Sequence, residues 1–215
     1  MARRAGVVVR STITSVMLNF YNDRYKMTTV YFIRHAEADN SIRDGRARPL
    51  TEKGLIDRHL VTAFLREKHI DAVLSSPFRR AVETIANFAE QNGFAIEMIE
   101  EFRERRSDSD WDRSTYNAFI ERQWVDFSYT LSDGECLAEV QERNIAALRR
   151  VLACYKGKNI VIGTHGTALS TIINYYDSTY GFADFMAMVN ILPWVVKMDF
   201  YGDVCAGIEK IDLFQ

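Results

Sequence analysis

The sequence has few of the residues that mark several large protein classes. Its three cysteines, Cys136, Cys154 and Cys205, are an odd number without a close pair and without a histidine at zinc-site spacing. A disulfide framework and a structural zinc ion are therefore not expected, and the cytoplasm is the expected location. Only 11 glycines and 3 prolines occur among 215 residues, which excludes collagen-like and low-complexity proteins.

Long apolar stretches and a strong net charge are also missing. The uncharged run Ile160–Tyr176 includes several polar residues and is shorter than the roughly 20 apolar residues of a membrane span. Lysine and arginine together number 27 and aspartate and glutamate 29, a net charge of −2, so neither nucleic acid nor an anionic membrane is expected as the main partner. With 47% hydrophobic and 26% charged residues, the composition is that of a soluble globular protein with a substantial core.

The first 26 residues differ from the rest of the chain. They carry five basic residues against a single acid, Asp23, and the apolar run Gly6–Val9 ends at Arg10. A secretory signal needs a longer apolar segment, so export is not expected. We expect residues 1–26 to be an extension, either a disordered tail or the product of an upstream start, ahead of a single domain over 27–215. An organellar transit peptide is the alternative for this extension.

Strands and helices alternate along the rest of the sequence. Short runs of β-branched and aromatic residues predict strands, and apolar residues at helical spacing predict helices. The predicted strands are 28–34, 71–75, 96–99, 159–164, 194–200 and 207–213, and the predicted helices are 51–68, 77–90, 135–155 and 166–176. The stretch 103–130 is predicted to be a loop with a helix. This alternation indicates an α/β fold, a three-layer α/β/α sandwich with a mainly parallel central sheet.

Polar residues suited to catalysis follow three of the predicted strands. The first strand ends in Arg34 and is followed by His35. The second leads within one helical turn to Arg80, and the fourth is followed by His165. Because ligands bind at the carboxyl ends of parallel strands, we expect these side chains in one crevice beside helix N-termini. Arginines and helix N-termini together select an oxyanion, and phosphate is the one we expect.

Each of these residues also has a purely structural explanation. A histidine such as His35, taken alone, is more often a packed or capping residue, and Arg79 and Arg80 on a helix are commonly solvated charges. His165 fits either role. The convergence of three strand ends at one rim is what favours a functional site. His59 and His69 lack such neighbours and are expected at the surface.

Four segments of the sequence occur in a characteristic order. They are RHAEADN at 34–40, SSPFRRAVET at 75–84, FRER at 102–105 and GTHG at 163–166. In this order they resemble the histidine phosphatase superfamily, also called the phosphoglycerate mutase-like family. PLTEKG at 49–54 and GECLAEVQER at 134–143 resemble its secondary markers, and the resemblance covers roughly residues 28–212.

The resemblance implies a covalent mechanism. His35 would attack phosphorus and become a phosphohistidine, and His165 would assist at the phosphoryl oxygens. A neutral imidazole is needed for this attack, and neighbouring cations favour it. Glu104 would protonate the leaving alkoxide and later take a proton from water, with Glu101 as the alternative acid.

The resemblance also implies how the phosphate is bound. Arg34 and Arg80 would stabilise the charge of the transition state, and Asn40 and Gly166 would contact the phosphate. Asn40 lies one position closer to His35 than the family's asparagine usually does, which puts its role in doubt. No metal ion or other cofactor is expected, since the cationic side chains supply the positive charge.

The predicted reaction is hydrolysis of a phosphate monoester, a small phosphorylated metabolite. Cofactor-dependent phosphoglycerate mutases carry a long insertion after the acid, with a Tyr and Lys motif, whereas about 30 residues separate Glu104 from Gly134 here and none resembles that motif. Mutase activity is therefore the alternative. A phosphate-binding module without activity is a third possibility, although it would be expected to have lost His35 or Glu104. Turnover of p-nitrophenyl phosphate discriminates between an enzyme and such a module.

The segment expected to cover the pocket, residues 105–124, mixes charged and aromatic residues. Its aspartates nearly cancel its arginines, so a polyanionic substrate does not follow from this segment. Both an amphipathic cap and a role in substrate recognition fit the pattern. The residues concerned are Arg105, Arg106, Arg113, Arg122, Trp111, Tyr116, Phe119, Trp124, Asp108, Asp110 and Asp112.

Overall fold

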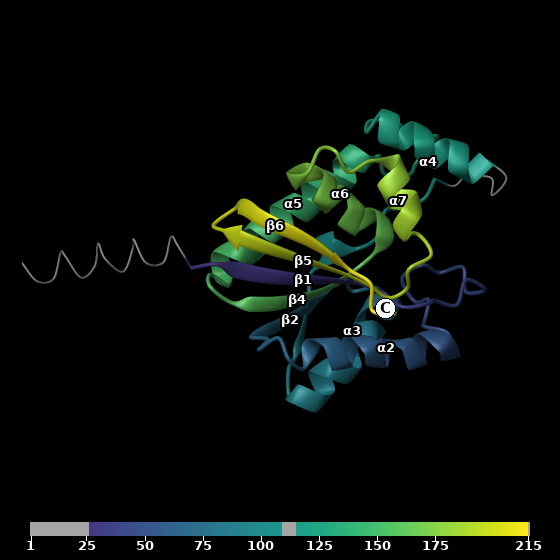
Figure 1. The fold of residues 1–215 in the computed structure, drawn as a ribbon. Coiled ribbons are helices and arrows are strands. Elements are labelled where there is room, and N and C mark those ends of the chain that lie inside the picture. Colours follow the sequence, from purple (N-terminus) through teal and green to yellow (C-terminus); the bar gives the residue numbers. More distant parts are fainter. Residues whose placement is uncertain (1–25, 109–114, 215) are drawn as a thin grey trace, which may run out of the picture.

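A computed structural model describes residues 26–108 and 115–214, and over these ranges the chain alternates between strands and helices (Figure 1). The elements are β1 (Thr28–Arg34), α2 (Glu52–Leu65), β2 (Ala72–Ser75), α3 (Arg79–Asn92), β3 (Ile96–Met98), the 3-10 helix η1 (Glu100–Phe102), α4 (Tyr116–Val125), α5 (Leu137–Cys154), β4 (Asn159–Thr164), α6 (Gly166–Tyr176), α7 (Phe182–Met188), β5 (Trp194–Tyr201) and β6 (Val204–Ile211). The α/β class predicted from the sequence is confirmed.

The strands form one mixed sheet in the order β3-β2-β4-β1-β5-β6. The strands β3, β2, β4 and β1 are parallel neighbours, as predicted. Strand β5 pairs antiparallel with β1, and β6 pairs antiparallel with β5. This last pair is a hairpin because Gly202, with φ of 66°, adopts the left-handed conformation that a tight turn requires.

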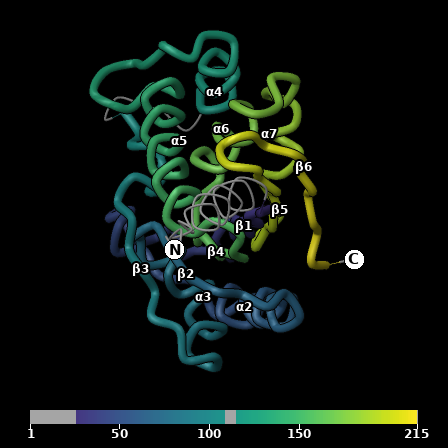
Figure 2. The backbone as a smooth tube through the Cα atoms, turned by 90° about the vertical axis from the view of Figure 1, so that its left-hand side faces the viewer, coloured from purple at the N-terminus to yellow at the C-terminus, as the bar shows by residue number. Residues whose placement is uncertain are grey.

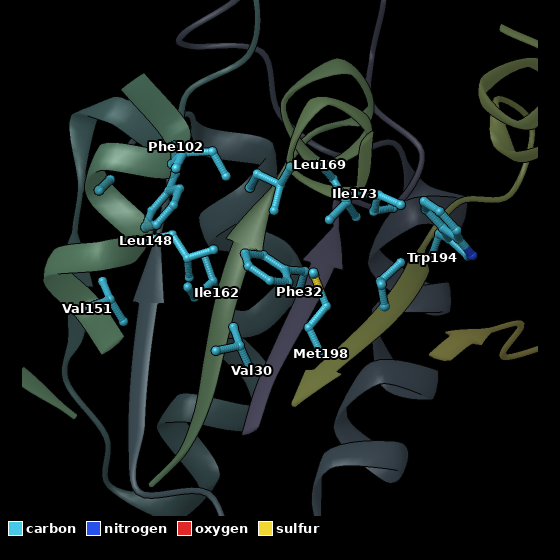
Figure 3. Packing of buried hydrophobic residues seen from close by; sticks show 14 of the residues in the cluster. Val30, Phe32, Phe102, Leu148, Val151, Ile162, Leu169, Ile173, Trp194 and Met198 are labelled. Atoms are coloured by element: carbon cyan, nitrogen blue, oxygen red, sulfur yellow. The ribbon is translucent and has the colours of Figure 1, made fainter. Parts of the chain in front are cut away.

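Helices cover both faces of the sheet, which gives the predicted three layers. Figures 1 and 2 show α2 and α3 on one face and α4 to α7 on the other. Side chains alternate along a strand. Val30 and Phe32 of β1 pack with residues of α5 and α6 (Figure 3), while Tyr31 and Ile33 pack against α2 and α3 on the other face. Within residues 26–108 and 115–214, no helix has the length and apolar character needed to cross a membrane.

The register of the parallel strands brings their carboxyl ends to one level. Arg34 at the end of β1 is paired with Thr164 at the end of β4, and Ser75 of β2 is paired with Gly163. The next residue on each of β1 and β4 is a histidine, and the backbone N–H of His35 donates to the carbonyl of Thr164 over 3.1 Å. The predicted convergence of these strand ends is therefore a consequence of sheet register.

Several predicted boundaries differ from the structure by one to three residues, and two of these differences have a clear physical reason. Helix α3 begins at Arg79 and not at Pro77, because the carbonyl of Phe78 accepts the first hydrogen bonds of the helix. Pro77 and Phe78 instead form a short turn in which the N–H of Phe78 donates to Ser76 Oγ over 3.2 Å. The final strand begins at Val204 and not at Gly207, since the hairpin at Gly202 extends the pairing with β5.

Helix α7 was not predicted from the sequence. Its seven residues are too few to display a clear helical period, and most of its stability comes from packing. The available signal was Asp184, whose carboxylate accepts from the N–H of Gly181 over 3.1 Å at the start of the helix. Phe185 and Met188 are buried in the core, and the ring of Phe185 packs against Trp124 of α4.

Residues 1–26 lie almost wholly outside the described residues, so their dispensability stays a prediction. A chain that begins at Met27 should keep its activity and melt within a few degrees of the full chain. The reason is that β1 starts at Thr28, whereas Arg34 and His35 lie at the opposite end of that strand. Thermal unfolding and a phosphatase assay test this. A drop in melting temperature of more than about 5 °C, or roughly 1–2 kcal/mol, would show that the extension packs on the domain.

Candidate active site

His35 is held as a neutral imidazole whose Nε2 has no hydrogen-bond partner among the described residues. Its Nδ1 lies 2.7 Å from the carbonyl oxygen of Ala36, and because a carbonyl only accepts, Nδ1 carries the proton and Nε2 carries the lone pair. Burial, followed by the charges of Arg80 and Arg34, lowers the pKa of His35 well below its usual value near 6.5. At neutral pH the side chain therefore has the form that a nucleophile needs.

His165 lies beside His35 at the start of α6. The two imidazole rings have centroids 5.3 Å apart and meet edge to face, and the ring of Phe78 lies 5.1 Å from His165 on another side. His165 Nε2 is 2.7 Å from Ser76 Oγ. Burial, followed by the charge of Arg80, lowers the pKa of His165 well below its usual value as well. Ser76 belongs to a motif found in the sequence, but its contact with His165 was not foreseen.

Arg80 reaches the site from the first turn of α3. Its Nη1 donates to the carbonyl of Gly45 over 2.5 Å, and its guanidinium carbon lies 5.2 Å from the centre of the Phe78 ring. Burial lowers the pKa of Arg80 to about 10, an effect that nearby Glu104 opposes, so the side chain remains cationic at pH 7. Its Nε is buried and has no hydrogen-bond partner among the described residues, which leaves a donor for a ligand.

Arg34 divides its donors between the fold and the site. Its Nη atoms donate to three carbonyls at and beyond the end of α7, those of Met188 (2.7 Å), Val189 (3.0 Å) and Ile191 (3.2 Å). Its Nε is buried and finds no partner within the described part of the chain. Burial lowers the pKa of Arg34 to about 10, again opposed by Glu104. The sequence suggested phosphate binding for Arg34, and the geometry leaves mainly Nε for that purpose.

Glu104 is fixed at the N-terminus of α6. Its Oε1 accepts from the backbone N–H groups of Arg105 (2.8 Å) and Ala168 (3.1 Å), and its Oε2 accepts from the N–H of Thr167 (3.0 Å). The alternative acid, Glu101, has its carboxylate paired with Arg150 on α5 and lies outside the pocket that Glu104 lines. The structure therefore places Glu104, and not Glu101, in the pocket wall and within electrostatic range of Arg34 and Arg80.

Asn40 and Gly166 differ in how near they come to the other site residues. Asn40 is exposed on the wall of the pocket, where its Oδ1 accepts from Arg48 Nη1 over 3.1 Å. Gly166 is the first residue of α6, and a Cβ at this position would lie 3.3 Å from Arg34 Nε. Glycine here leaves the guanidinium room beside the helix N-terminus.

The loop after His35 is anchored by the segment PLTEKG. Thr51 caps α2 by accepting from the N–H of Gly54 over 3.0 Å, and its own N–H donates to the carbonyl of Glu37 over 3.0 Å. An ideal Cβ on Gly54 would lie 2.1 Å from that same carbonyl oxygen. Only glycine permits this close approach, which holds the loop following His35 against α2.

A pocket of about 860 Å³ opens beside these residues. Asn40, Phe78, Arg80 and Glu104 belong to its wall, together with further arginines from loops 40–48 and 103–107. His35 and His165 do not line the pocket themselves, but His165 packs against Phe78 of its wall and the charge of Arg80 acts on both rings. The arrangement offers a nucleophile, cations and a carboxyl group to one phosphate ester.

Comparison with known proteins identifies the family. The family model of the histidine phosphatase superfamily (branch 1) matches residues 30–189. The chain belongs to this superfamily.

Relatives in the superfamily include both mutases and phosphatases. A probable phosphoglycerate mutase, GpmB, of Yersinia pestis is 27% identical over 159 residues, which cover 69% of this chain and 74% of that protein. The structure of a phosphoglycerate mutase from Bacillus anthracis str. Sterne matches with a TM-score of 0.69 at 18% identity, over 90% of this chain and 96% of that one. A phosphoserine phosphatase from Entamoeba histolytica matches with a TM-score of 0.68 at 20% identity, over 84% and 96%. These similarities establish the fold.

A buried ion-pair cluster fixes the Glu104 loop in this superfamily member. Glu135 pairs with Arg103 (2.5 Å) and with Arg143 (3.0 Å). Arg143 in turn donates to the backbone carbonyls of Glu101, Arg103 and Glu104, and so ties α5 to the segment that carries the acid. Glu135 and Arg143 belong to the marker GECLAEVQER, but their supporting role was not recognised in the sequence.

Replacing Glu135 with glutamine should destabilise the protein by about 2–4 kcal/mol, because it leaves two partly buried arginines without a counter-charge. Burial alone would raise the pKa of Glu135, but hydrogen bonds from Arg103, Arg143 and the N–H of Arg106 outweigh it and lower the pKa to about 2. A lowered pKa means that the stabilisation is present above the unfolded value near 4.5 and is lost as the pH falls toward 2.

Urea unfolding of wild type and Glu135→Gln between pH 3 and 7 measures this effect. The difference in free energy of unfolding should be largest above pH 5 and should shrink toward pH 3. Glu142→Gln is the matched control, since Glu142 lies exposed on the same helix. A Glu135→Gln protein within about 0.5 kcal/mol of wild type at pH 7 would contradict the role of the cluster.

The cap segment, residues 105–124, packs aromatic side chains into the core where it is described. Phe119 is buried in the core, and Trp124 packs its ring against Tyr180 and Phe185. Asp108 is buried and accepts through Oδ1 from the N–H groups of Leu131, Ser132 and Gly134. Asp110, Trp111, Asp112 and Arg113 lie outside the described residues.

Proposed function

We propose that this protein is a phosphomonoesterase that hydrolyses a small phosphorylated metabolite through a phosphohistidine at His35. The observation that carries the proposal is the state of His35, a neutral imidazole whose Nδ1 is held by the carbonyl of Ala36 and whose Nε2 is free. A purely structural role would not explain why a histidine keeps a deprotonated nitrogen without a hydrogen bond close to two arginines. The cytoplasm is the proposed location of this activity.

In the first step the lone pair of His35 Nε2 attacks phosphorus, and the bond from phosphorus to the ester oxygen breaks. Arg80 Nε and Arg34 Nε are the buried donors positioned to bind the phosphoryl oxygens, with His165 beside them. Their charges stabilise the negative charge that the transferring group carries through the transition state. In the second step water attacks the phosphohistidine, the bond from nitrogen to phosphorus breaks, and inorganic phosphate leaves.

Glu104 moves the protons of both steps. A carboxylate oxygen has two lone-pair sites, and Oε1 uses both for backbone N–H groups, whereas Oε2 uses one, for Thr167. Oε2 therefore keeps one site open for a proton. It protonates the leaving alkoxide in the first step and takes a proton from the attacking water in the second, which restores the starting state.

Turnover of p-nitrophenyl phosphate and of an alkyl phosphate between pH 5 and 7 tests the proposal. We expect release of inorganic phosphate across this range, because burial and the charges of Arg80 and Arg34 lower the pKa of His35 and so favour the neutral nucleophile. Rapid acid quench during turnover should also trap an acid-labile phosphoprotein. An absence of turnover with every ester would refute the phosphatase assignment.

Mutase activity is the second candidate, favoured by the names of the GpmB relative and of the Bacillus anthracis structure. A mutase would convert 3-phosphoglycerate to 2-phosphoglycerate in the presence of 2,3-bisphosphoglycerate, faster than it releases inorganic phosphate. The ratio of isomerisation to hydrolysis, followed by phosphorus NMR, separates the two reactions. We expect hydrolysis to dominate.

A further inference from the structure

The pocket beside the catalytic residues has a strong excess of positive charge. Seven arginines line it against two glutamates, although the whole chain has a net charge of −2. One of these glutamates, Glu104, accepts hydrogen bonds from backbone N–H groups at the start of α6 and does not form an ion pair with any of these arginines. Such a concentration of one charge sign selects ligands of the opposite sign.

Three of the seven arginines are already paired with acids. Arg46 forms two hydrogen bonds with Glu100, of 2.8 and 2.7 Å. Arg103 is held by the buried Glu135, and Arg105 lies 3.8 Å from an oxygen of Asp108. Their charges are compensated locally, and they shape the pocket wall.

The other four have no carboxylate within 4 Å among the described residues. Arg80 serves the reacting phosphate. Arg106 donates to the carbonyl of Asp133. Arg48 donates to the carbonyl of Ile42 and to Asn40 Oδ1, which are neutral acceptors, and Arg43 is exposed on the same loop. Loop 40–48 therefore brings two uncompensated guanidinium groups to the pocket.

The charge of Arg48 acts on the residues of the active site. Arg48 contributes to lowering the pKa of Arg80 and of His35, which places it within electrostatic range of the reacting phosphate. Like charges this close repel one another, and an anion bound between them relieves the repulsion. One phosphate engages Arg80 and Arg34, which leaves Arg48 and Arg43 available to a second anionic group.

We propose that the substrate carries a second oxyanion, a phosphate or a carboxylate, which Arg48 and Arg43 bind while the first phosphate reacts at His35. This inference rests on the proposed phosphatase function and adds the substrate class. Guanidinium groups suit both kinds of oxyanion, because they present paired N–H donors to two oxygens. The charge balance of the cap segment did not indicate a polyanionic substrate. The two arginines that bind the second anion, Arg43 and Arg48, come instead from loop 40–48, which is distant in sequence.

Three esters with the same carbon chain test the proposal at constant ionic strength. They are propyl phosphate, 3-phosphonooxypropanoate and propane-1,3-diyl bisphosphate. Two of these esters carry a second anionic group. We expect kcat/KM for at least one of them to exceed that for propyl phosphate by about tenfold or more, which is the gain in binding that one charge-assisted contact provides. Comparing the last two compounds tells whether the second group is a carboxylate or a phosphate. Equal kcat/KM values for all three would overturn the proposal.

Variants assign the preference to residues. Arg48→Gln and Arg43→Gln should each lower the ratio of kcat/KM for the preferred ester to that for propyl phosphate, and together they should bring it near one. Arg79→Gln is the matched control, because Arg79 is exposed on α3, pairs with Glu83 and does not line the pocket. An unchanged ratio in the double variant would overturn the assignment to this loop.

Binding to the His35→Ala protein separates this inference from the proposed function. Titration calorimetry with the three esters should show tighter binding of an ester that carries a second anionic group. Arg48→Gln combined with Arg43→Gln in the same background should abolish the difference. Preferential binding without turnover by wild type would refute the phosphatase but retain the second-anion site. Turnover of all three esters with equal binding would retain the phosphatase and refute the site.

Discussion

Replacement of His35 by alanine should reduce phosphatase turnover to the background rate. The substitution removes the nitrogen that attacks phosphorus, and no other described side chain at the rim offers a nucleophile in the same state: His165 Nε2 is already hydrogen-bonded to Ser76. The remaining arginines still bind phosphate, so the variant should bind substrate without converting it. Wild type should give an acid-labile phosphoprotein on rapid quench, and His35→Ala should give none.

The control for this experiment is His59→Ala. His59 is exposed on α2, away from the pocket, so its loss should leave turnover within about twofold of wild type. Circular dichroism should show the same folded state for both variants, because a small cavity at His35 does not remove a core contact of the sheet. Substantial turnover by His35→Ala would move the nucleophile to another residue.

Replacement of Glu104 by glutamine should have an effect that depends on the leaving group. An alkoxide is a poor leaving group and needs a proton as it departs, so loss of the acid should slow hydrolysis of propyl phosphate by about 10²–10⁴-fold. p-Nitrophenolate leaves without help, and its ester should be affected much less. Glutamine can still accept backbone N–H bonds through its amide oxygen, so the position of the side chain at the start of α6 should be largely retained.

Glu101→Gln provides the matched control for the general acid. Glu101 lies three residues earlier, pairs with Arg150 and does not line the pocket. Its replacement should change the two rates equally and by little. Equal losses for both esters in Glu104→Gln would show that Glu104 does not donate the proton. A selective loss with propyl phosphate in Glu101→Gln would assign the role to that residue.

The local pattern of apolar and polar residues was sufficient to predict most of the strands and helices. Strand β4 and helix α6 were predicted with their observed bounds, because a β-branched run and a helical apolar face report directly on local structure and burial. The start of α3 was placed two residues early, since a proline suits the first turn of a helix as well as the turn before it. Helix α7 was not predicted, because it is stabilised by packing against residues distant in sequence, such as Trp124.

The sequence by itself determined the α/β order of elements and the identity of the strand-end residues, since each of these depends on a few neighbouring positions. The tertiary structure alone decided what those residues contact. It joined Arg34 to carbonyls beyond α7, His165 to Ser76, and Glu104 to the backbone of α6. It also gathered the arginines of loop 40–48 into the pocket. Such contacts join segments far apart along the chain, and they depend on sheet register and helix packing, which no local pattern specifies.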